Sequence, residues 1–185
     1  MSEGPFASLL AGELGLNTPR FTLAPLNTDD ASAFLAHLSD PAVVEYMDID
    51  PQTDIAETLG VIGWAQGLRA EGTGVRWAIR DLSAAFIGTA GFNTLVWERG
   101  CRGEVAYDVS RRFWGRRVMD EVLPAILGFG FNTLGLRRIE AVVTAGNEPS
   151  CRLLERHGFE REGVLKEHAF WKDRFWDQVV YGKLG

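Results

Sequence analysis

The sequence predicts a mixed α/β domain built around one central sheet. Apolar residues recur at helical spacing in some segments and at every second position in others, so both kinds of element are expected. Cap and turn residues separate these segments. The predicted order is a strand, two helices, three strands, a helix, a strand, a helix and two strands. Because this order does not repeat a strand–helix–strand unit, it argues against a regular parallel array.

The composition limits the kind of protein. At 185 residues with 46% hydrophobic residues, the chain is long enough to form one domain with a full core. No apolar run fits a membrane helix, and the N-terminus lacks the pattern of a secretory signal, so we expect a cytoplasmic protein without membrane contact. A net charge of −6 argues against nucleic-acid binding and is compatible with an amine-bearing partner. The two cysteines lack metal-ligand spacing, and we expect no metal.

The N-terminal third is expected to contain an arm, a strand and two helices. Residues 1–18 have few periodic apolar positions, which predicts a loosely ordered arm before a single domain over 19–185. Alternation from Arg20 to Pro25 predicts a short strand. Acids in the first turn favour a helix from Thr28 to His37. A second helix is expected from Asp54, a good cap residue, to about Arg69.

Three strands and a helix are expected in the middle of the chain. Alternating residues predict strands near Arg76–Arg80, Phe86–Phe92 and Glu104–Val109, of which the first two form a hairpin. Beyond Gly115, apolar residues return at helical spacing and predict a helix that ends near Thr133. One proline lies inside this helix, but the apolar spacing continues on both sides of it.

The C-terminal part is expected to add a strand, a helix and two strands. Arg138 to Val143 alternates as a strand, and Glu148 to His157 is a predicted helix that a glycine ends. The last two strands are expected near Val164–Phe170 and Asp177–Lys183.

The segment RRFWGRR at positions 111–117 lies where a strand ends and a helix begins. A helix N-terminus offers unpaired backbone N–H groups, and four arginines surround this one in an acidic chain. The segment is therefore either a phosphate-binding turn or an ordinary solvated basic turn. The residues alone leave both interpretations open.

Three local sequences, in this order, resemble the GNAT acyltransferases, in the branch that includes ribosomal-protein N-terminal acetyltransferases. They are RRFWGRR, NEPSCRLLERHGF from Asn147, and the closing FWKDRFWDQVVYGKL, and the resemblance covers about residues 19–184. It implies a mostly antiparallel sheet of about seven strands with helices on both faces. It also implies direct transfer of an acetyl or other short acyl group from acyl-coenzyme A to a primary amine in a ternary complex.

The partners are less defined than the reaction. The acceptor amine belongs to a small molecule or to a protein N-terminus, and we expect a monomer or a homodimer. The alternative is a non-catalytic domain that binds or senses acyl-coenzyme A, because Arg117 and Ala169 depart from the family pattern.

The resemblance also implies where acetyl-coenzyme A binds. Family members hold the pyrophosphate on the backbone amides of a Gln/Arg-x-x-Gly-x-Gly/Ala turn, in which Arg112 and Gly115 match. Arg117 occupies the second small position, where it either contacts a phosphate or obstructs the site. The strand before the turn is expected to splay from its neighbour and to pair with the pantetheine amides. The expected cofactor-binding residues are Tyr107, Asp108, Val109, Arg112, Trp114, Gly115, Arg116, Arg117, Val118 and Asn147.

The catalytic candidates are a serine and two glutamates. Ser150 is expected to face the sulfur and act as the acid, because the tyrosine of other branches falls at Leu154. Asn147 and Ser150 are also compatible with a simple helix cap. The family's late acid falls at Ala169, so Glu167 is the candidate base if its strand is regular. Glu104 is the other candidate, with a structural carboxylate as its alternative.

Aromatic residues gather near the C-terminus and are expected either to line an acceptor pocket or to form core. With two tryptophans from earlier in the chain, they are Phe170, Trp171, Phe175, Trp176, Tyr181, Trp64 and Trp77. Asp173 and Asp177 flank this group, where they meet a cationic substrate or lie in solvated turns.

Overall fold

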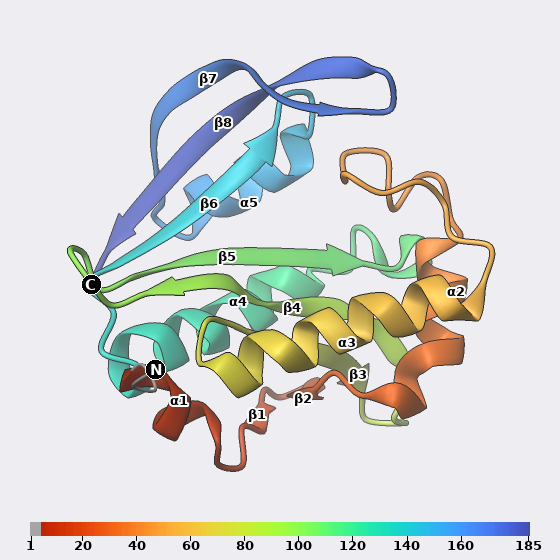
Figure 1. Cartoon of the computed structure of the whole chain (residues 1–185), viewed down its shortest axis with the longest axis horizontal. Helices are drawn as coiled ribbons and strands as arrows, with labels where there is room; N and C mark the ends of the chain where they lie inside the picture. Colours follow the sequence, from red (N-terminus) through yellow and green to blue (C-terminus); the bar gives the residue numbers. More distant parts are fainter. Residues whose placement is uncertain (1–4) are drawn as a thin grey trace.

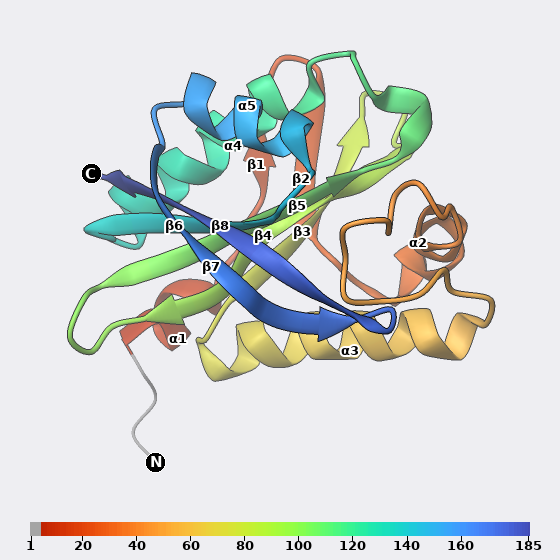
Figure 2. The same ribbon diagram turned by 90° about the horizontal axis from the view of Figure 1, so that it is seen from above.

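A computed structural model describes residues 5–185 and shows one mixed sheet with helices on both faces (Figures 1 and 2). The strand order is β1-β2-β3-β4-β5-β6-β8-β7, and every neighbouring pair is antiparallel except β5 and β6. The strands are β1 (Leu16–Asn17), β2 (Phe21–Pro25), β3 (Val75–Asp81), β4 (Phe86–Val96), β5 (Arg102–Val109), β6 (Arg138–Thr144), β7 (Glu160–Trp171) and β8 (Arg174–Leu184). The predicted fold class is confirmed, with eight strands in place of about seven.

Two apolar clusters hold the helices to the sheet. Helices α4 and α5 pack on one face, and α2 and α3 on the other (Figure 2). The helices are α1 (Pro5–Leu10), α2 (Ala31–Leu38), α3 (Ile55–Glu71), α4 (Val118–Gly128) and α5 (Glu148–Arg156). A 3-10 turn, Thr28–Asp30, precedes α2, and a π-helical turn, Phe129–Thr133, extends α4. None of the helices within residues 5–185 is both long and apolar enough to cross a membrane.

The expectation of a loosely ordered arm is wrong for residues 5–18. Phe6 and Leu10, four residues apart on α1, are buried in the core, and so is Leu14 in the irregular segment that follows. The indole of Trp77 donates to the Leu14 carbonyl at 2.5 Å, and Arg69 Nε donates to the Leu10 carbonyl at 2.9 Å. Residues 1–4 of the expected arm lie outside the described residues.

Local sequence signals explain most element boundaries. The Asp54 side chain accepts from the Ala56 N–H at the start of α3, and Gly72 ends this helix with a φ of +72°. Helix α4 continues through Pro124. The β7–β8 hairpin turns at Lys172 and Asp173, which have φ values of +51° and +55°. These two residues alone form the turn, so strand pairing continues up to Trp171 and Arg174 on its two sides. Both strands are therefore longer than predicted.

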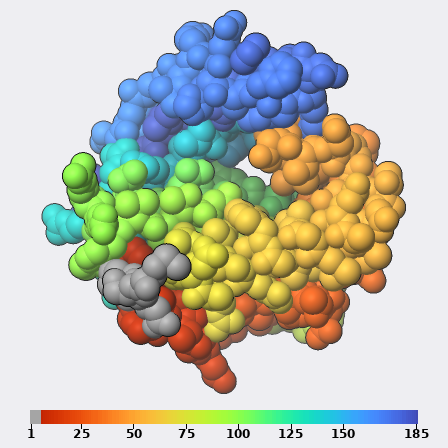
Figure 3. Space-filling model, viewed as in Figure 1, coloured from red at the N-terminus to blue at the C-terminus, as the bar shows by residue number. Residues whose placement is uncertain are grey.

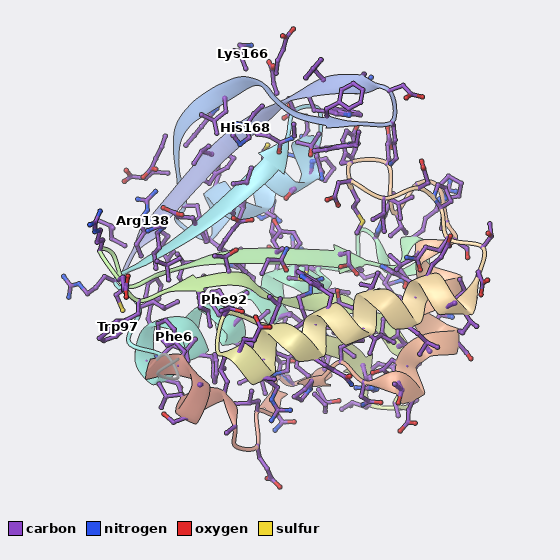
Figure 4. The ribbon with its side chains drawn as sticks, viewed as in Figure 1. Phe6, Phe92, Trp97, Arg138, Lys166 and His168 are labelled. Carbon is purple, nitrogen blue, oxygen red and sulfur yellow. The ribbon has the colours of Figure 1, made fainter. Side chains whose placement is uncertain are left out.

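The pairing of β5 with β6 positions the functional site. These parallel strands pair only from Arg102 to Glu104 on β5 and from Arg138 to Glu140 on β6. Beyond Glu104 they diverge as expected, while β6 stays paired with β8 up to Thr144 (Figure 1). Arg138 lies at the closed end of the resulting wedge (Figure 4). The later residues of β5 therefore have no strand partner on this side.

Candidate active site

A cavity of about 1600 Å³ fills the wedge between β5 and β6. Its walls come from these two strands, the N-terminal turn of α5, one face of α3 and the loop between α2 and α3. Figure 3 shows the hollow between the C-terminal strands, in blue, and the α2–α3 loop, in orange. The RRFWGRR turn reaches one end of the cavity through Trp114, Gly115 and Arg117.

The RRFWGRR turn presents backbone amides at the start of α4. A 3-10 turn, Arg111–Phe113, is followed by Gly115 and Arg117 with φ values of +72° and +56°. The N–H groups of Gly115 and Arg117 have no acceptor among residues 5–185. The left-handed conformation of Arg117 costs about 1 kcal/mol in a residue with a side chain, which explains why a small residue suits this position.

Arg20, which the sequence did not point to, orients this turn. Its guanidinium donates to the carbonyl oxygens of Arg116 and Arg117, each at 3.2 Å, and to Glu121 Oε2 at 2.6 Å. Because trans peptide units hold C=O and N–H on opposite sides, the N–H groups of Arg117 and Val118 face away from Arg20. No local signal identifies Arg20, since it lies 96 residues from Arg116 in the chain.

The side chains of Arg112 and Arg116 do not line the cavity. Arg112 donates to the Phe86 carbonyl at 3.2 Å, and both guanidinium groups lie over the Phe113 ring, at 4.8 Å and 5.6 Å. Trp114 lies at the rim, and its indole donates to the Val109 carbonyl at 2.6 Å. Two of the predicted cofactor-binding arginines therefore stabilise the turn from outside.

The carboxylate of Asp108 belongs to a buried network rather than to the cavity surface. Its Oδ2 accepts from Arg76 Nη2 at 2.8 Å and from Thr89 Oγ1 at 2.6 Å. His37 Nε2 lies 2.8 Å from Oδ1, an ion-pair distance without hydrogen-bond alignment. Burial raises the pKa of Asp108, but the contacts with His37, Arg76 and Thr89 outweigh it and hold the pKa at about 2. Asp108 lines the cavity, but its carboxylate is almost fully buried and already occupied by these partners.

His37 extends the same network to the start of the RRFWGRR turn. Its Nδ1 lies 2.8 Å from the hydroxyl of Ser110, the residue that follows β5 and precedes the turn. The Ser110 N–H donates to the Ile87 carbonyl on β4 at 2.8 Å. The end of β5 is therefore anchored from α2 and from β4, which leaves its opposite edge open toward β6.

Two hydroxyl groups meet across the wedge at the start of α5. The phenolic oxygen of Tyr107 lies 2.7 Å from Ser150 Oγ, and burial raises the pKa of Tyr107 to about 12. Asn147 caps α5 by accepting from the Ser150 N–H at 3.3 Å, so the capping interpretation holds for its side chain. Leu154, where other branches have tyrosine, is fully buried in the core.

Glu104 and Glu167, the two candidate bases, differ sharply in environment. The assumption of a regular strand around Glu167 is wrong, because the β7–β8 register shifts between Leu165 and Ala169 and Glu167 has a φ of +48°. Its side chain is exposed and does not line the cavity. In Figure 4, Lys166 projects outward from this irregular part of β7.

Glu104 lies where β5 and β6 separate and lines the cavity. Burial, and secondly the charge of Glu140, raise the pKa of Glu104. No hydrogen bond or ion pair is found for its carboxylate among residues 5–185. The neighbouring Glu140 accepts from Arg138 Nε at 2.7 Å. Glu104 has no such bond to backbone or arginine within residues 5–185, so its structural alternative gains no support.

The far end of the cavity is acidic and aromatic. It is lined by Glu45, Tyr46, Asp48, Glu57, Trp64 and Trp171. The other C-terminal aromatics divide between core and solvent: Trp176 and Tyr181 are buried, whereas Phe170 and Phe175 are each 60% exposed on the hairpin. Asp177 accepts from Lys166 at 2.7 Å outside the cavity. The α2–α3 loop, which supplies three of these residues, was not anticipated as part of the site.

Solved acetyltransferases share this architecture. Mycobacterium smegmatis RimJ in complex with CoA-disulfide superposes with a TM-score of 0.83, at 20% identity over 94% of this chain and 87% of that one. The Salmonella typhimurium acetyl transferase that modifies the N-terminal serine of ribosomal protein L7/L12 gives a TM-score of 0.80, at 19% identity over 91% and 96% of the two chains. The chain therefore has the fold that these solved acetyltransferases share.

Sequence comparison assigns the family. The family model of the acetyltransferase (GNAT) domain matches residues 20–160. An uncharacterized N-acetyltransferase of Bacillus licheniformis, p20, is 36% identical over 170 residues, which cover 91% of this chain and 95% of that protein. The chain belongs to the GNAT acetyltransferase family and is an N-acetyltransferase.

Proposed function

We propose that this protein transfers an acetyl group from acetyl-coenzyme A to a primary amine by direct attack in a ternary complex. The observation that carries the proposal is the divergence of β5 from β6, which brings the amides of the turn and the Ser150 hydroxyl onto one cavity. A phosphate group fits the turn, because the free N–H groups of Gly115 and Arg117 stand at a helix N-terminus.

The unpaired side of β5 supports binding of the pantetheine. Between Val105 and Val109 the strand has no partner toward β6, and an extended chain with amide groups replaces such a partner well. This path leads from the turn toward Ser150 and Asn147, which line the opposite wall. The cavity therefore offers polar groups to both ends of the donor substrate.

The chemistry requires a proton acceptor for the amine and a donor for the leaving thiolate. Glu104 is favoured as the acceptor through water, because it lines the cavity and its carboxylate has a raised pKa and no partner among the described residues. Ser150 is favoured as the donor. A cationic acceptor first loses one proton to become the free amine, and this proton passes to solvent. As the C–N bond forms and the C–S bond breaks, the nitrogen loses a second proton and the sulfur gains one, so the reaction is balanced.

The acceptor is expected at the acidic and aromatic end of the cavity, where Glu45, Asp48 and Glu57 favour a cationic amine. Both a small amine and a protein N-terminus satisfy this requirement. The related Salmonella enzyme, whose substrate is a protein N-terminus, supports including peptides among the candidates.

Thiol release from acetyl-coenzyme A tests the proposal. The wild-type protein is assayed with a panel of small amines and of peptides that begin with serine or alanine, and the acetylated product is identified by mass spectrometry. Acceptor-dependent thiol release supports the proposal. Tight binding of coenzyme A by calorimetry without turnover of any acceptor would instead favour a sensing domain.

A further inference from the structure

The contact between Tyr107 and Ser150 leaves one hydroxyl proton free to donate a hydrogen bond into the cavity. Their oxygen atoms lie 2.7 Å apart, and neither hydroxyl has another hydrogen-bond partner within the described part of the chain. Each hydroxyl carries one proton, and one proton makes the bond between them. One O–H group therefore remains available, on a wall where both residues line the cavity.

The chemistry of the two hydroxyls decides which proton remains. A phenol is a stronger hydrogen-bond donor and a weaker acceptor than an alkyl alcohol, so Tyr107 donates and Ser150 accepts. Burial raises the pKa of Tyr107 to about 12, so the phenol stays protonated at neutral pH. The proton of Ser150 is then directed away from Tyr107.

Other groups near this wall do not substitute for the pair. Leu154 is apolar and fully buried, and Cys151 packs into the core. The hydroxyl of Thr144, which also lines the cavity, already donates to the Tyr46 carbonyl at 3.0 Å. The free proton of the pair is thus the available hydroxyl proton at the start of α5.

We propose that Tyr107 is a positioning residue that holds the Ser150 hydroxyl toward the sulfur of coenzyme A. This inference rests on the proposed function. When the amine nitrogen has bonded to the carbonyl carbon, the C–S electron pair leaves on sulfur and Ser150 gives it a proton. Solvent protonates Ser150 again after the thiol departs, and the proton lost by the amine goes to water or to Glu104. Tyr107 keeps its own proton throughout.

Kinetics of Tyr107→Phe test the role in turnover, because this change removes one oxygen and keeps the ring. We expect kcat to fall about tenfold or more, at the lower end of the range for proton-transfer catalysis, with little change in the KM for acetyl-coenzyme A. Ser150→Ala should lower kcat by at least the same factor, and the double variant should lower kcat no further than Ser150→Ala alone. Tyr181→Phe is the matched control, because its hydroxyl bonds Glu155 on the same helix outside the cavity. It should retain wild-type kcat.

The pKa of the bound coenzyme A thiol provides a readout that does not depend on turnover. It is followed by thiolate absorbance, with the titration of the free protein subtracted. A hydroxyl that donates to sulfur stabilises the thiolate, so the bound thiol should have a lower pKa in the wild type than in Tyr107→Phe or Ser150→Ala.

Two results would overturn the positioning role: an identical thiol pKa in wild type and both variants, or losses of kcat that multiply in the double variant. If calorimetry shows no binding of coenzyme A to the wild type, the proposed function itself fails, and this inference with it.

Discussion

Arg20 holds Arg117 in a conformation that its own side chain disfavours. The guanidinium of Arg20 donates to the Arg117 carbonyl at 3.2 Å, and Arg117 has a φ of +56°. The same guanidinium bonds the Arg116 carbonyl and Glu121, so it connects the start of β2 to the first turn of α4. The shape of the proposed pyrophosphate site therefore depends on a residue remote in sequence.

Replacing Arg20 should weaken binding of coenzyme A with little loss of stability. Arg20→Met keeps much of the side-chain length but removes all donors. We expect about a tenfold weaker affinity by calorimetry, equivalent to roughly 1.4 kcal/mol. The side chain is half exposed, so the midpoint of denaturant unfolding should change little. Arg102→Met is the control, because Arg102 lies at the closed end of the wedge. Equal affinities in the two variants would refute the role of Arg20.

Replacing Arg117 by glycine should separate backbone strain from phosphate contact. Arg99→Gly is a matched control, because Arg99 has a φ of +59° and does not line the cavity. Each substitution relieves the strain of a left-handed backbone conformation and also raises the conformational entropy of the unfolded chain. The resulting changes in unfolding free energy should therefore be small and alike in the two variants. Only Arg117→Gly should weaken binding of coenzyme A, severalfold at low salt and less at high salt. Tighter binding would show that Arg117 obstructs the site.

Glu104 should control the pH dependence of turnover. The deprotonated form is the base, so kcat/KM should rise with pH through the raised pKa of Glu104. Glu104→Gln should remove this rise and leave coenzyme A affinity nearly unchanged. Glu167→Gln, which alters an exposed carboxylate on β7, should keep the wild-type profile. A wild-type profile in Glu104→Gln would assign deprotonation of the amine to solvent.

The same raised pKa has a consequence for stability. At pH values between the pKa of Glu104 in the unfolded chain and its raised pKa in the folded protein, the folded state binds more protons at this residue. The contribution of Glu104 to the free energy of unfolding therefore falls as pH rises. Glu104→Gln should therefore unfold at a denaturant concentration no lower than the wild type at pH 7. A clear loss of stability at pH 7 would indicate a structural role for the carboxylate.

Asp108 should be essential for stability. Asp108→Asn leaves Arg76 buried without its carboxylate partner, which costs about 3–5 kcal/mol in comparable buried pairs. The pKa of Asp108 is depressed to about 2, so the stability it contributes is present above the unfolded value of about 4 and is lost as pH falls toward 2. Denaturant unfolding between pH 2 and 7 measures both effects. Asp173→Asn, at the exposed hairpin turn, should be neutral. A small loss in Asp108→Asn would mean that the network tolerates an amide.

The sequence by itself determined the fold class and the position of the RRFWGRR turn between a strand and a helix. Apolar periodicity, caps and turn residues are local signals, and they act within a few residues of the element that they specify. Asp54 and Gly72 at the ends of α3 illustrate this, as does the helix that begins after RRFWGRR. The motifs around Gly115 and Asn147 were sufficient to indicate the family.

Only the tertiary structure decided how the site is assembled. Tyr107 meets Ser150 across 43 residues, and Arg20 meets the turn across almost 100, so no local pattern encodes either contact. The expectation of a regular strand around Glu167 was wrong, because the pairing between β7 and β8 is irregular there and the side chain lies in solvent. The expectation of a loosely ordered arm was wrong for a similar reason, since only the folded sheet supplies the surface that Phe6 and Leu14 cover. The sequence specifies which functional groups are present, but the direction in which each side chain points depends on strand pairing and on packing between distant segments.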